Sequence, residues 1–226
     1  LGLYSQFNNP LITNAPWRIY SNLPTNKDEE NEYNSDICNQ FSAYRLGDVI
    51  LDFHPDIIIS INDHWQYECV VNHPLTQYCH WVVMPAVDSS PLQDSWLENL
   101  TKASRITTYS EYGKKIIEEQ TNNRIKVFAI TPPGVSDKFH PILNKKDLRN
   151  KYHIPNNSFI VGMVARNQKR KLFPDLIETF SRFVQEHPEN PNLFLLLHSS
   201  FPDLGWNFPK LIKSSGISKN ILLTYI

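Results

Sequence analysis

The feature that most constrains this sequence is the repeated alternation of short apolar runs with segments of helical length. The clearest run is Asp56-Ile-Ile-Ile-Ser-Ile61, a β-branched stretch of the kind that is buried on both faces in a parallel sheet. Further strands are expected over residues 18–21, 81–84, 105–109, 126–130, 159–164, 193–197 and 221–225. Strands separated by helix-length segments favour a doubly wound α/β fold with parallel sheets.

Helical spacing and start signals predict the segments between these strands. Apolar residues recur at helical spacing over 39–53, and Pro55 ends the pattern. Ser110 is placed to cap a helix over 111–120. Further helices are expected over 96–103, 145–152, 174–185 and 208–214, and the acidic stretch from Asn26 to Asp36 predicts a surface loop.

A charged, proline-flanked stretch between Phe139 and Pro155 marks the junction of two domains. We therefore expect one doubly wound domain over residues 1–142 and a second over 143–226. The second has too few expected strands for a whole doubly wound domain, so we expect it to be truncated.

Charge and cysteine content argue against several classes of protein. Lys and Arg number 22 against 23 Asp and Glu, which leaves no electrostatic footprint for nucleic acid. Cys38, Cys69 and Cys79 are too few and too irregularly spaced for a disulfide framework, which favours a reducing compartment. No apolar run approaches the roughly 20 residues of a membrane-spanning helix. We expect a cytoplasmic protein, although a peripheral membrane protein has the same composition, so membrane association stays open.

The most informative segment is Val161-Gly-Met-Val-Ala-Arg-Asn-Gln-Lys-Arg-Lys171. It lies where the first strand of the second domain gives way to a helix. Ligands of α/β sheets bind at the carboxyl ends of parallel strands, and the N-terminus of a helix favours anions. Basic side chains at this place suit a diphosphate, and a solvated basic surface loop is the alternative.

This segment resembles the entry to the donor domain of glycosyltransferase family 4. Three more segments resemble the family in the same order along the chain. Thr108–Gly113 resembles the segment before the last acceptor-domain helix, Pro133–Pro141 the passage into the donor domain, and Leu197–Trp206 a downstream donor segment. The resemblance covers the chain from about Asp48 onward.

The resemblance implies a GT-B fold, in which two Rossmann-like domains with doubly wound parallel sheets face each other across a cleft. It implies a hexosyltransferase-like enzyme that moves a sugar from a nucleotide-diphosphate-sugar donor to a glycan, lipid or other hydroxyl acceptor, with retention of configuration. No obligatory metal and no other cofactor is implied, and no nucleic-acid partner is expected.

The resemblance also assigns donor-side residues. Arg166 and Lys171 match the basic pair that holds the donor diphosphate and stabilises its charge as the glycosidic bond breaks, a catalytic role. Asn167, His198 and Ser199 are expected to contact the donor as well. Three further residues are expected to shape the adjoining loop, namely Asp203, Gly205 and Trp206, with a place in the core as the alternative for Trp206.

Three residues are the candidates on the acceptor side. Asp63 and His64 follow a strand and are expected to bind sugar hydroxyls, with a helix-capping Asp and a half-buried His as the alternative. Asp88 follows the next strand at the position that faces the cleft in the family, where it is expected to bind the acceptor hydroxyl and take part in catalysis. An Asp in a turn is the alternative there.

The sequence departs from the family pattern in three respects. Ser136 stands where the family usually has Asp. The first strand with its Gly-rich loop and the paired-Glu segment, which engage the donor in the family, are both missing. We therefore expect this chain alone to be inactive, and a non-catalytic nucleotide-sugar or glycan-binding fragment of the same fold remains the alternative.

Three unrelated functions receive less support from the sequence. The cluster from Gln168 to Lys171 suits nucleic acid, but the near-neutral charge and the lack of a helix-turn-helix or zinc pattern count against it. No G-x-G-x-x-G follows any expected strand, which argues against a dinucleotide oxidoreductase. Neither an H-E-x-x-H motif nor a Cys-His cluster points to zinc.

Overall fold

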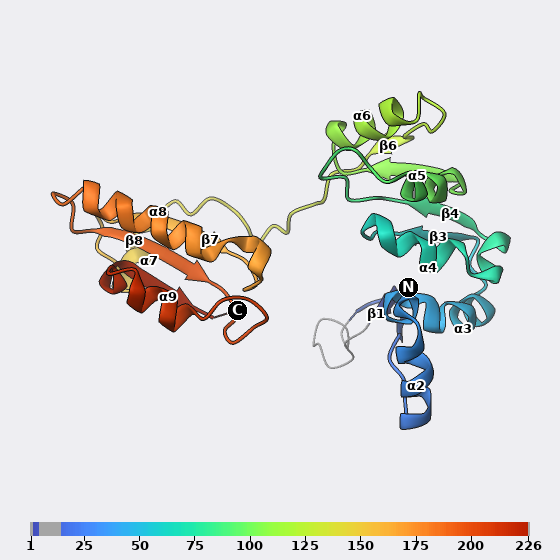
Figure 1. Ribbon diagram of the computed structural model, residues 1–226, viewed down its shortest axis with the longest axis horizontal. Coiled ribbons are helices and arrows are strands. Elements are labelled where there is room, and N and C mark those ends of the chain that lie inside the picture. The colour runs from blue at the N-terminus through green and yellow to red at the C-terminus, as the bar shows by residue number, and fades with distance from the viewer. Residues whose placement is uncertain (1, 5–14, 226) are drawn as a thin grey trace. The chain divides into compact units, whose positions relative to one another are not determined.

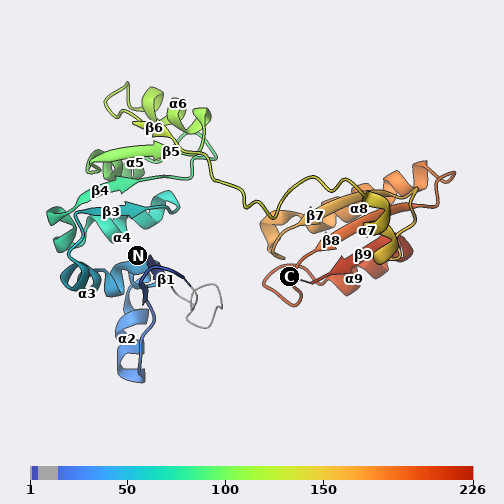
Figure 2. The same cartoon turned by 180° about the vertical axis from the view of Figure 1, so that it is seen from behind.

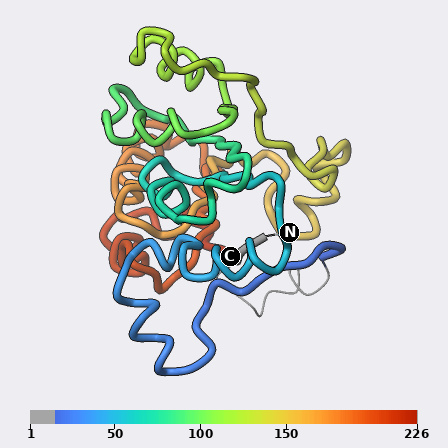
Figure 3. Tube along the Cα trace, turned by 90° about the vertical axis from the view of Figure 1, so that its right-hand side faces the viewer, coloured from blue at the N-terminus to red at the C-terminus, as the bar shows by residue number. Residues whose placement is uncertain are grey.

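The chain divides into two compact units, Leu1–Ser136 and Asp137–Ile226. The computed structural model describes residues 2–4 and 15–225. The chain passes from one unit to the other through the yellow stretch of the trace in Figure 3. The sequence placed the boundary between residues 142 and 143, and the contacts of the folded chain place it between Ser136 and Asp137.

The first unit contains a two-stranded and a four-stranded parallel sheet (Figure 1). The small sheet pairs β1 (Gly2–Tyr4) with β2 (Ile19–Ser21), and the larger sheet has the order β3-β4-β5-β6. Its strands are β3 (Ile57–Ser60), β4 (His80–Val83), β5 (Arg105–Thr108) and β6 (Ala129–Ile130). The helices among its described residues are α2 (Lys27–Ser35), α3 (Tyr44–Phe53), α4 (Tyr67–Val71), α5 (Asp94–Thr101) and α6 (Glu111–Gln120). Shorter helical segments are η1 (Asn39–Ala43), η2 (His64–Gln66) and η3 (Pro74–Tyr78).

One face of the larger sheet carries the core of this unit. Trp81 and Val83 of β4 and Ile106 of β5 are buried against apolar residues of α3, α4, α5 and α6. On β3, by contrast, Ile57 and Ile59 are 54% and 66% exposed. The expectation that this strand is buried on both faces is therefore wrong, because only the face of Ile58 packs against the core and the side chains at 57 and 59 point to the opposite face of the sheet.

Residues 27–35 form helix α2, where the sequence analysis predicted a surface loop. The side chain of Asn26 accepts hydrogen bonds from the backbone N–H groups of Asp28 and Glu29, each at 3.0 Å. Acidic side chains in the first turn also complement the positive end of the helix dipole. No residue of α2 is buried, so local capping accounts for this helix where apolar periodicity does not.

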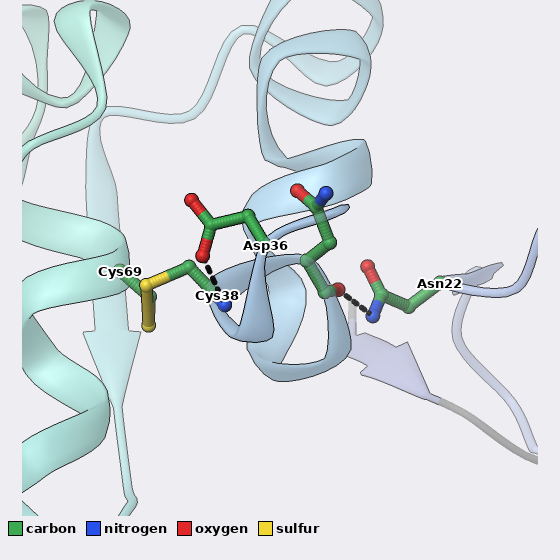
Figure 4. The surroundings of a disulfide bond; sticks show 5 residues. Asn22, Asp36, Cys38 and Cys69 are labelled. Atoms are coloured by element: carbon green, nitrogen blue, oxygen red, sulfur yellow. Dashed lines mark hydrogen bonds between the residues drawn. A yellow bond between two sulfur atoms is a disulfide. The ribbon is translucent and has the colours of Figure 1, made fainter. Parts of the chain in front are cut away.

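A disulfide joins Cys38, which directly precedes η1, to Cys69 in α4, with the Cα atoms 4.9 Å apart (Figure 4). The same segment is held by two hydrogen bonds, from the Cys38 N–H to Asp36 Oδ1 at 2.8 Å and from Asn22 Nδ2 to the Asn39 carbonyl at 2.7 Å. The spacing of the cysteines gave no indication of this bond. Disulfides persist in oxidising compartments and are rare in the cytosol, so the bond counts against the expected cytoplasmic location.

The second unit is a three-stranded parallel sheet of order β7-β8-β9, packed against helices. Its strands are β7 (Phe159–Val164), β8 (Leu193–His198) and β9 (Ile221–Thr224). The helices are α7 (Lys145–Lys151), α8 (Phe173–Glu186) and α9 (Phe208–Ser214), with short turns η4 (Lys169–Lys171) and η5 (Ser218–Asn220). Across both units, no described helix is long and apolar enough to span a membrane.

The core of the second unit lies between the sheet and helices α8 and α9. Leu193, Leu195 and Leu197 alternate along β8 and are buried against aromatic and aliphatic residues of the two helices. Figure 2 shows the sheet in front of α8 and α9, with α7 on the viewer's side. Because β7, β8 and β9 are parallel, their carboxyl ends meet at one edge of the sheet, where the loops with the candidate donor residues begin.

The disulfide gives a direct test of this fold. We expect one reactive thiol in the unreduced, denatured protein, that of Cys79, and three after reduction. Replacing both Cys38 and Cys69 by Ser is expected to lower the free energy of unfolding by about 3–4 kcal/mol, because the bond closes a loop of 31 residues. Thiol titration and urea denaturation measure the two effects. Cys79→Ser is the matched control that keeps the bond, and three thiols before reduction would contradict the assignment.

Candidate functional site

The candidate donor site lies in the second unit, on the loop that joins β7 to α8. The loop leaves β7 after Val164, passes through the turn Lys169–Lys171 and enters α8 at Phe173. Leu172 separates the turn from the helix with φ of 50° and ψ of 42°. This left-handed conformation is rare for a residue with a β-carbon, so the loop turns sharply just before the helix begins. No side chain caps α8.

Arg166 makes a two-pronged ion pair with Asp203, which lies in the loop after β8. Its Nε donates to Asp203 Oδ2 at 3.3 Å and its Nη2 to Oδ1 at 3.1 Å. Asp203 Oδ2 also accepts from Ser200 Oγ at 3.0 Å, and Oδ1 accepts from the Leu204 N–H at 2.8 Å. The hydrogen bond from Arg166, together with these two, holds the pKa of Asp203 below its usual value. The carboxylate is therefore ionised at neutral pH.

Asn167 ties the β7–α8 loop to the loop that precedes α9. Its Nδ2 donates to the Trp206 carbonyl at 2.7 Å, and its Oδ1 accepts from the Trp206 N–H at 2.8 Å. The side chain is fully buried, and both its amide nitrogen and its amide oxygen are used to join the two loops. This structural role was not expected from the sequence, and the predicted contact between Asn167 and the donor stays a prediction.

Lys171 ends the turn before α8 and is half-buried. Within the described part of the chain, its ammonium group has neither an ion-pair nor a hydrogen-bond partner. Lys169 and Arg170, on the same turn, are exposed. The turn therefore presents an uncompensated positive charge beside the uncapped N-terminus of α8, a combination that favours an anion.

His198 and Ser199 follow one another at the end of β8. His198 Nδ1 lies 2.7 Å from Thr224 Oγ1 at the end of β9, which holds the ring at the sheet edge. Ser199 is buried, and its Oγ has no hydrogen-bond partner among the described residues. The predicted donor contacts of these two residues stay predictions.

The three predicted acceptor residues belong to the first unit, at the carboxyl ends of β3 and β4. Asp63 and Asp88 are exposed, and both carboxylates act electrostatically on His64, which is 6% exposed. Asp63 stands at the cap position of η2 but makes no side-chain capping hydrogen bond. The structure thus brings the three residues into one neighbourhood. The interpretation of Asp63 as a helix cap is not supported, because its carboxylate accepts no hydrogen bond from the first turn of η2.

His64 is an unusual buried histidine. Its ring is stacked on Trp96 of α5, with centroids 5.0 Å apart and planes 6° from parallel. Neither ring nitrogen has a partner of good hydrogen-bond geometry among the described residues, and the backbone of Ala86 interacts with the ring more loosely. Burial lowers the pKa of His64, and the backbone of Ala86, followed by the carboxylates of Asp88 and Asp63, offsets this in part. The ring is therefore neutral at physiological pH.

Two aromatic residues that the sequence analysis passed over support this neighbourhood. Tyr67 is fully buried, and its hydroxyl donates to the Asn62 carbonyl at 2.8 Å, beside Asp63. Burial raises the pKa of Tyr67 well above its usual value, so the hydroxyl keeps its proton. Trp96 supplies the stacking surface for His64. Apolar periodicity placed Trp96 in a helix. Periodicity cannot show, however, that its indole stacks on His64, which comes from another segment of the chain.

Ser110 was predicted as a helix cap, and the structure confirms the cap. Its Oγ accepts a hydrogen bond from the Gly113 N–H at 3.2 Å, at the start of α6. This contact satisfies one of the free N–H groups of the first turn.

Comparison with solved structures finds proteins of similar fold, among them the following three. A glycosyltransferase from Rickettsia africae has a TM-score of 0.53 and 16% identity, over 92% of this chain and 59% of its own. The Anabaena protein HepE, solved in complex with UDP-glucose, has a TM-score of 0.59 and 14% identity, over 92% of this chain and 55% of its own. UDP-GlcNAc 2-epimerase from Neisseria meningitidis, bound to UDP-GlcNAc, has a TM-score of 0.52 and 14% identity, over 90% and 56%.

No known protein family and no curated protein matches the sequence. At identities of 14 to 16%, the three structures establish the fold and not a family within it. The chain has a GT-B-like fold, as the resemblance implied, and it spans between 55% and 59% of the length of these three proteins.

Gly205→Ala tests the tie between the two loops of the second unit. A β-carbon at Gly205 would lie 2.6 Å from the carbonyl carbon of Asn167 and closer still to two of its oxygens. We expect the substitution to separate the loops and to lower the free energy of unfolding by about 1–3 kcal/mol. Gly162→Ala is the matched control, since no atom lies within 4 Å of the added carbon. Equal stability of the two variants in urea denaturation would show that the loops are not held this closely.

His64 makes the stability of the first unit depend on pH. Because its pKa in the folded state is lowered from 6.5, the unfolded chain binds the proton more readily. The stability that the neutral ring contributes is complete above about pH 6.5 and is lost as the pH falls through the folded-state pKa. His64→Phe keeps an aromatic ring for Trp96 and removes the titration, so it should reduce the loss of stability between pH 7.5 and 5.5, measured by urea denaturation. His140→Phe, which replaces an exposed histidine, is the control. An unaltered pH dependence of stability in His64→Phe would refute the assignment of this titration to His64.

Proposed function

We propose that the protein is a nucleotide-sugar-dependent glycosyltransferase, in which the β7–α8 loop binds the diphosphate of the donor. The observation that carries this proposal is the position of Arg166 and Lys171. Both lie on one loop, between the carboxyl end of a parallel strand and the N-terminus of a helix that no side chain caps. Two proteins of similar fold were solved with UDP-glucose and UDP-GlcNAc, and both ligands carry a diphosphate.

The two cations suit complementary tasks. A guanidinium is planar and binds two phosphate oxygens at once, whereas an ammonium group acts as a compact point charge. As the glycosidic bond breaks, negative charge accumulates on the departing nucleoside diphosphate. Fixed positive groups stabilise that charge without reorganising, which lowers the barrier to transfer. Arg166 and Lys171 are therefore assigned to both donor binding and catalysis, and His198 and Ser199 to the rim of the same site.

The acceptor is assigned to the first unit. Asp88 and Asp63 present exposed carboxylates, which accept hydrogen bonds from sugar hydroxyls, and the buried neutral ring of His64 lies beside them. Asp88 is the residue we assign to the reacting hydroxyl. An acceptor rich in hydroxyl groups, such as a glycan or a glycosylated lipid, fits this set of side chains.

Several finer features belong to the same proposal. We assign the protein to glycosyltransferase family 4, with transfer of a hexose-like sugar, retention of anomeric configuration and no obligatory metal. The order of four sequence segments, from Thr108–Gly113 to Leu197–Trp206, supports the family. The proposed activity belongs to the whole protein, because this chain spans little more than half of the structures with which it shares its fold.

Binding of UDP tests the donor site, since UDP is the part common to both sugar nucleotides named above. Arg166→Ala and Lys171→Ala are each expected to raise the Kd for UDP about tenfold or more, because each removes a charged hydrogen-bond donor to phosphate. Isothermal titration calorimetry measures the change, and a thermal shift with UDP provides an independent readout. Arg182→Ala removes an exposed cation of α8 that is paired with Glu178, and it should bind UDP as the parent protein does. Unchanged affinity in both site variants would remove the assignment.

Turnover separates an enzyme from a binding fragment of the same fold. A glycosyltransferase consumes UDP-sugar only as the acceptor gains a sugar, and proton NMR of the product reports whether the anomeric configuration is retained. A UDP-sugar that is bound but recovered unchanged, with every acceptor tried, would favour the non-catalytic alternative. Conversion to an epimeric UDP-sugar without an acceptor would favour the reaction of the Neisseria protein instead.

A further inference from the structure

The ion pair between Arg166 and Asp203 joins two loops that are far apart in the sequence. The partners are 37 residues apart, and the parallel register of the sheet brings them together. Val164, at the end of β7, is paired with His198, at the end of β8. The loops that start after these two residues carry Arg166 and Asp203 to the same edge of the sheet.

The two partners are held very differently. The side chain of Asp203 is 9% exposed, and that of Arg166 is 63% exposed. Each Asp203 oxygen accepts one hydrogen bond from Arg166 and one from its own loop, from the Leu204 N–H and from Ser200 Oγ. The carboxylate is thus fixed by its own loop, and the guanidinium is the mobile group that it holds.

The pair leaves part of the guanidinium free. Arg166 uses Nε and Nη2 toward Asp203, and no described residue accepts a hydrogen bond from Nη1. Because the guanidinium is planar and rigid, fixing one edge also fixes the direction of the remaining N–H groups. An exposed arginine without such a partner samples many rotamers. A ligand that binds it then loses part of its binding free energy to the conformational entropy of ordering the side chain.

We propose that Asp203 is a positioning residue for the donor diphosphate, which holds the guanidinium of Arg166 so that its free edge faces the phosphates. The inference rests on the proposed function, since it takes a diphosphate as the ligand of Arg166. Asp203 itself does not touch the donor. The tie between Asn167 and Trp206 serves the same end, because it fixes the loop of Asp203 against the loop of Arg166.

The local charge favours this role over competition between Asp203 and the phosphates. A carboxylate that neutralised the only cation of a phosphate site would weaken binding. Here Lys169, Arg170 and Lys171 follow Arg166 on the same loop, so the site stays positive with Asp203 ionised. The two roles predict opposite signs. Removing the charge of Asp203 weakens UDP binding if the carboxylate positions Arg166, and strengthens binding if it competes.

A double-mutant cycle tests the proposal, with UDP as the probe and calorimetry of the whole chain as the readout. Asp203→Asn keeps the shape of the side chain and removes its charge, and we expect it to raise the Kd about tenfold, in the range of coupled neighbouring residues. Combined with Arg166→Ala, it should have no further effect beyond about twofold. Arg166→Lys keeps the charge without the two-pronged contact, so it should bind weakly and be insensitive to Asp203→Asn. Glu178→Gln, which breaks an exposed pair on α8, is the matched control.

The outcomes separate this inference from the proposed function. Failure of the parent protein to bind UDP would overturn both. UDP binding that Arg166→Ala weakens, but Asp203→Asn leaves unchanged or strengthens, would overturn the positioning role alone. An equal loss from Asp203→Asn in the presence and absence of Arg166 would show that Asp203 acts on the loop and not through the guanidinium. Should Asp203→Asn fail to fold, as judged by its melting curve, wild-type affinity in Arg166→Lys would overturn the proposal.

Discussion

Two hydrogen bonds from one buried amide govern the loops at the sheet edge of the second unit. Asn167 meets the backbone of Trp206 through both ends of its side chain, much as a neighbouring strand would. The approach is close enough that only glycine fits at position 205. Because the two loops are held together in this way, Arg166 and Asp203 lie within hydrogen-bonding distance of each other. The chemistry proposed for the guanidinium thus depends on a residue that itself faces no solvent.

The course of the chain was largely readable from the sequence because periodicity and capping are local. The strand over 159–164 and the helices over 111–120 and 208–214 are found as predicted. The acidic helix α2 was missed because its stability comes from Asn26 and the first turn rather than from an apolar stripe. Spacing alone carries no information about pairs that form only after the chain folds. Cys38 with Cys69 and Arg166 with Asp203 are both of this kind.

The candidate site shows the same division between local and long-range information. Topology placed Arg166 and Lys171 on a strand-to-helix loop, because a basic run after an apolar strand is a local pattern. The burial of Asn167 and Ser199 was not foreseen, since a polar residue after a strand is normally exposed there. His64 had two interpretations in the sequence, a ligand or a half-buried side chain. The structure shows a buried ring, stacked on an indole from another helix.

The exposed isoleucines of β3 have a consequence for handling the protein. An outer strand offers unpaired backbone groups, and natural proteins discourage pairing there with lysine, proline or a bulge. The segment Ile57–Ile61 has none of these residues, and its outward side chains at 57, 59 and 61 are all aliphatic. Such an edge promotes self-association as the concentration rises. Self-association through this strand is therefore expected to limit the concentration at which the chain stays monomeric.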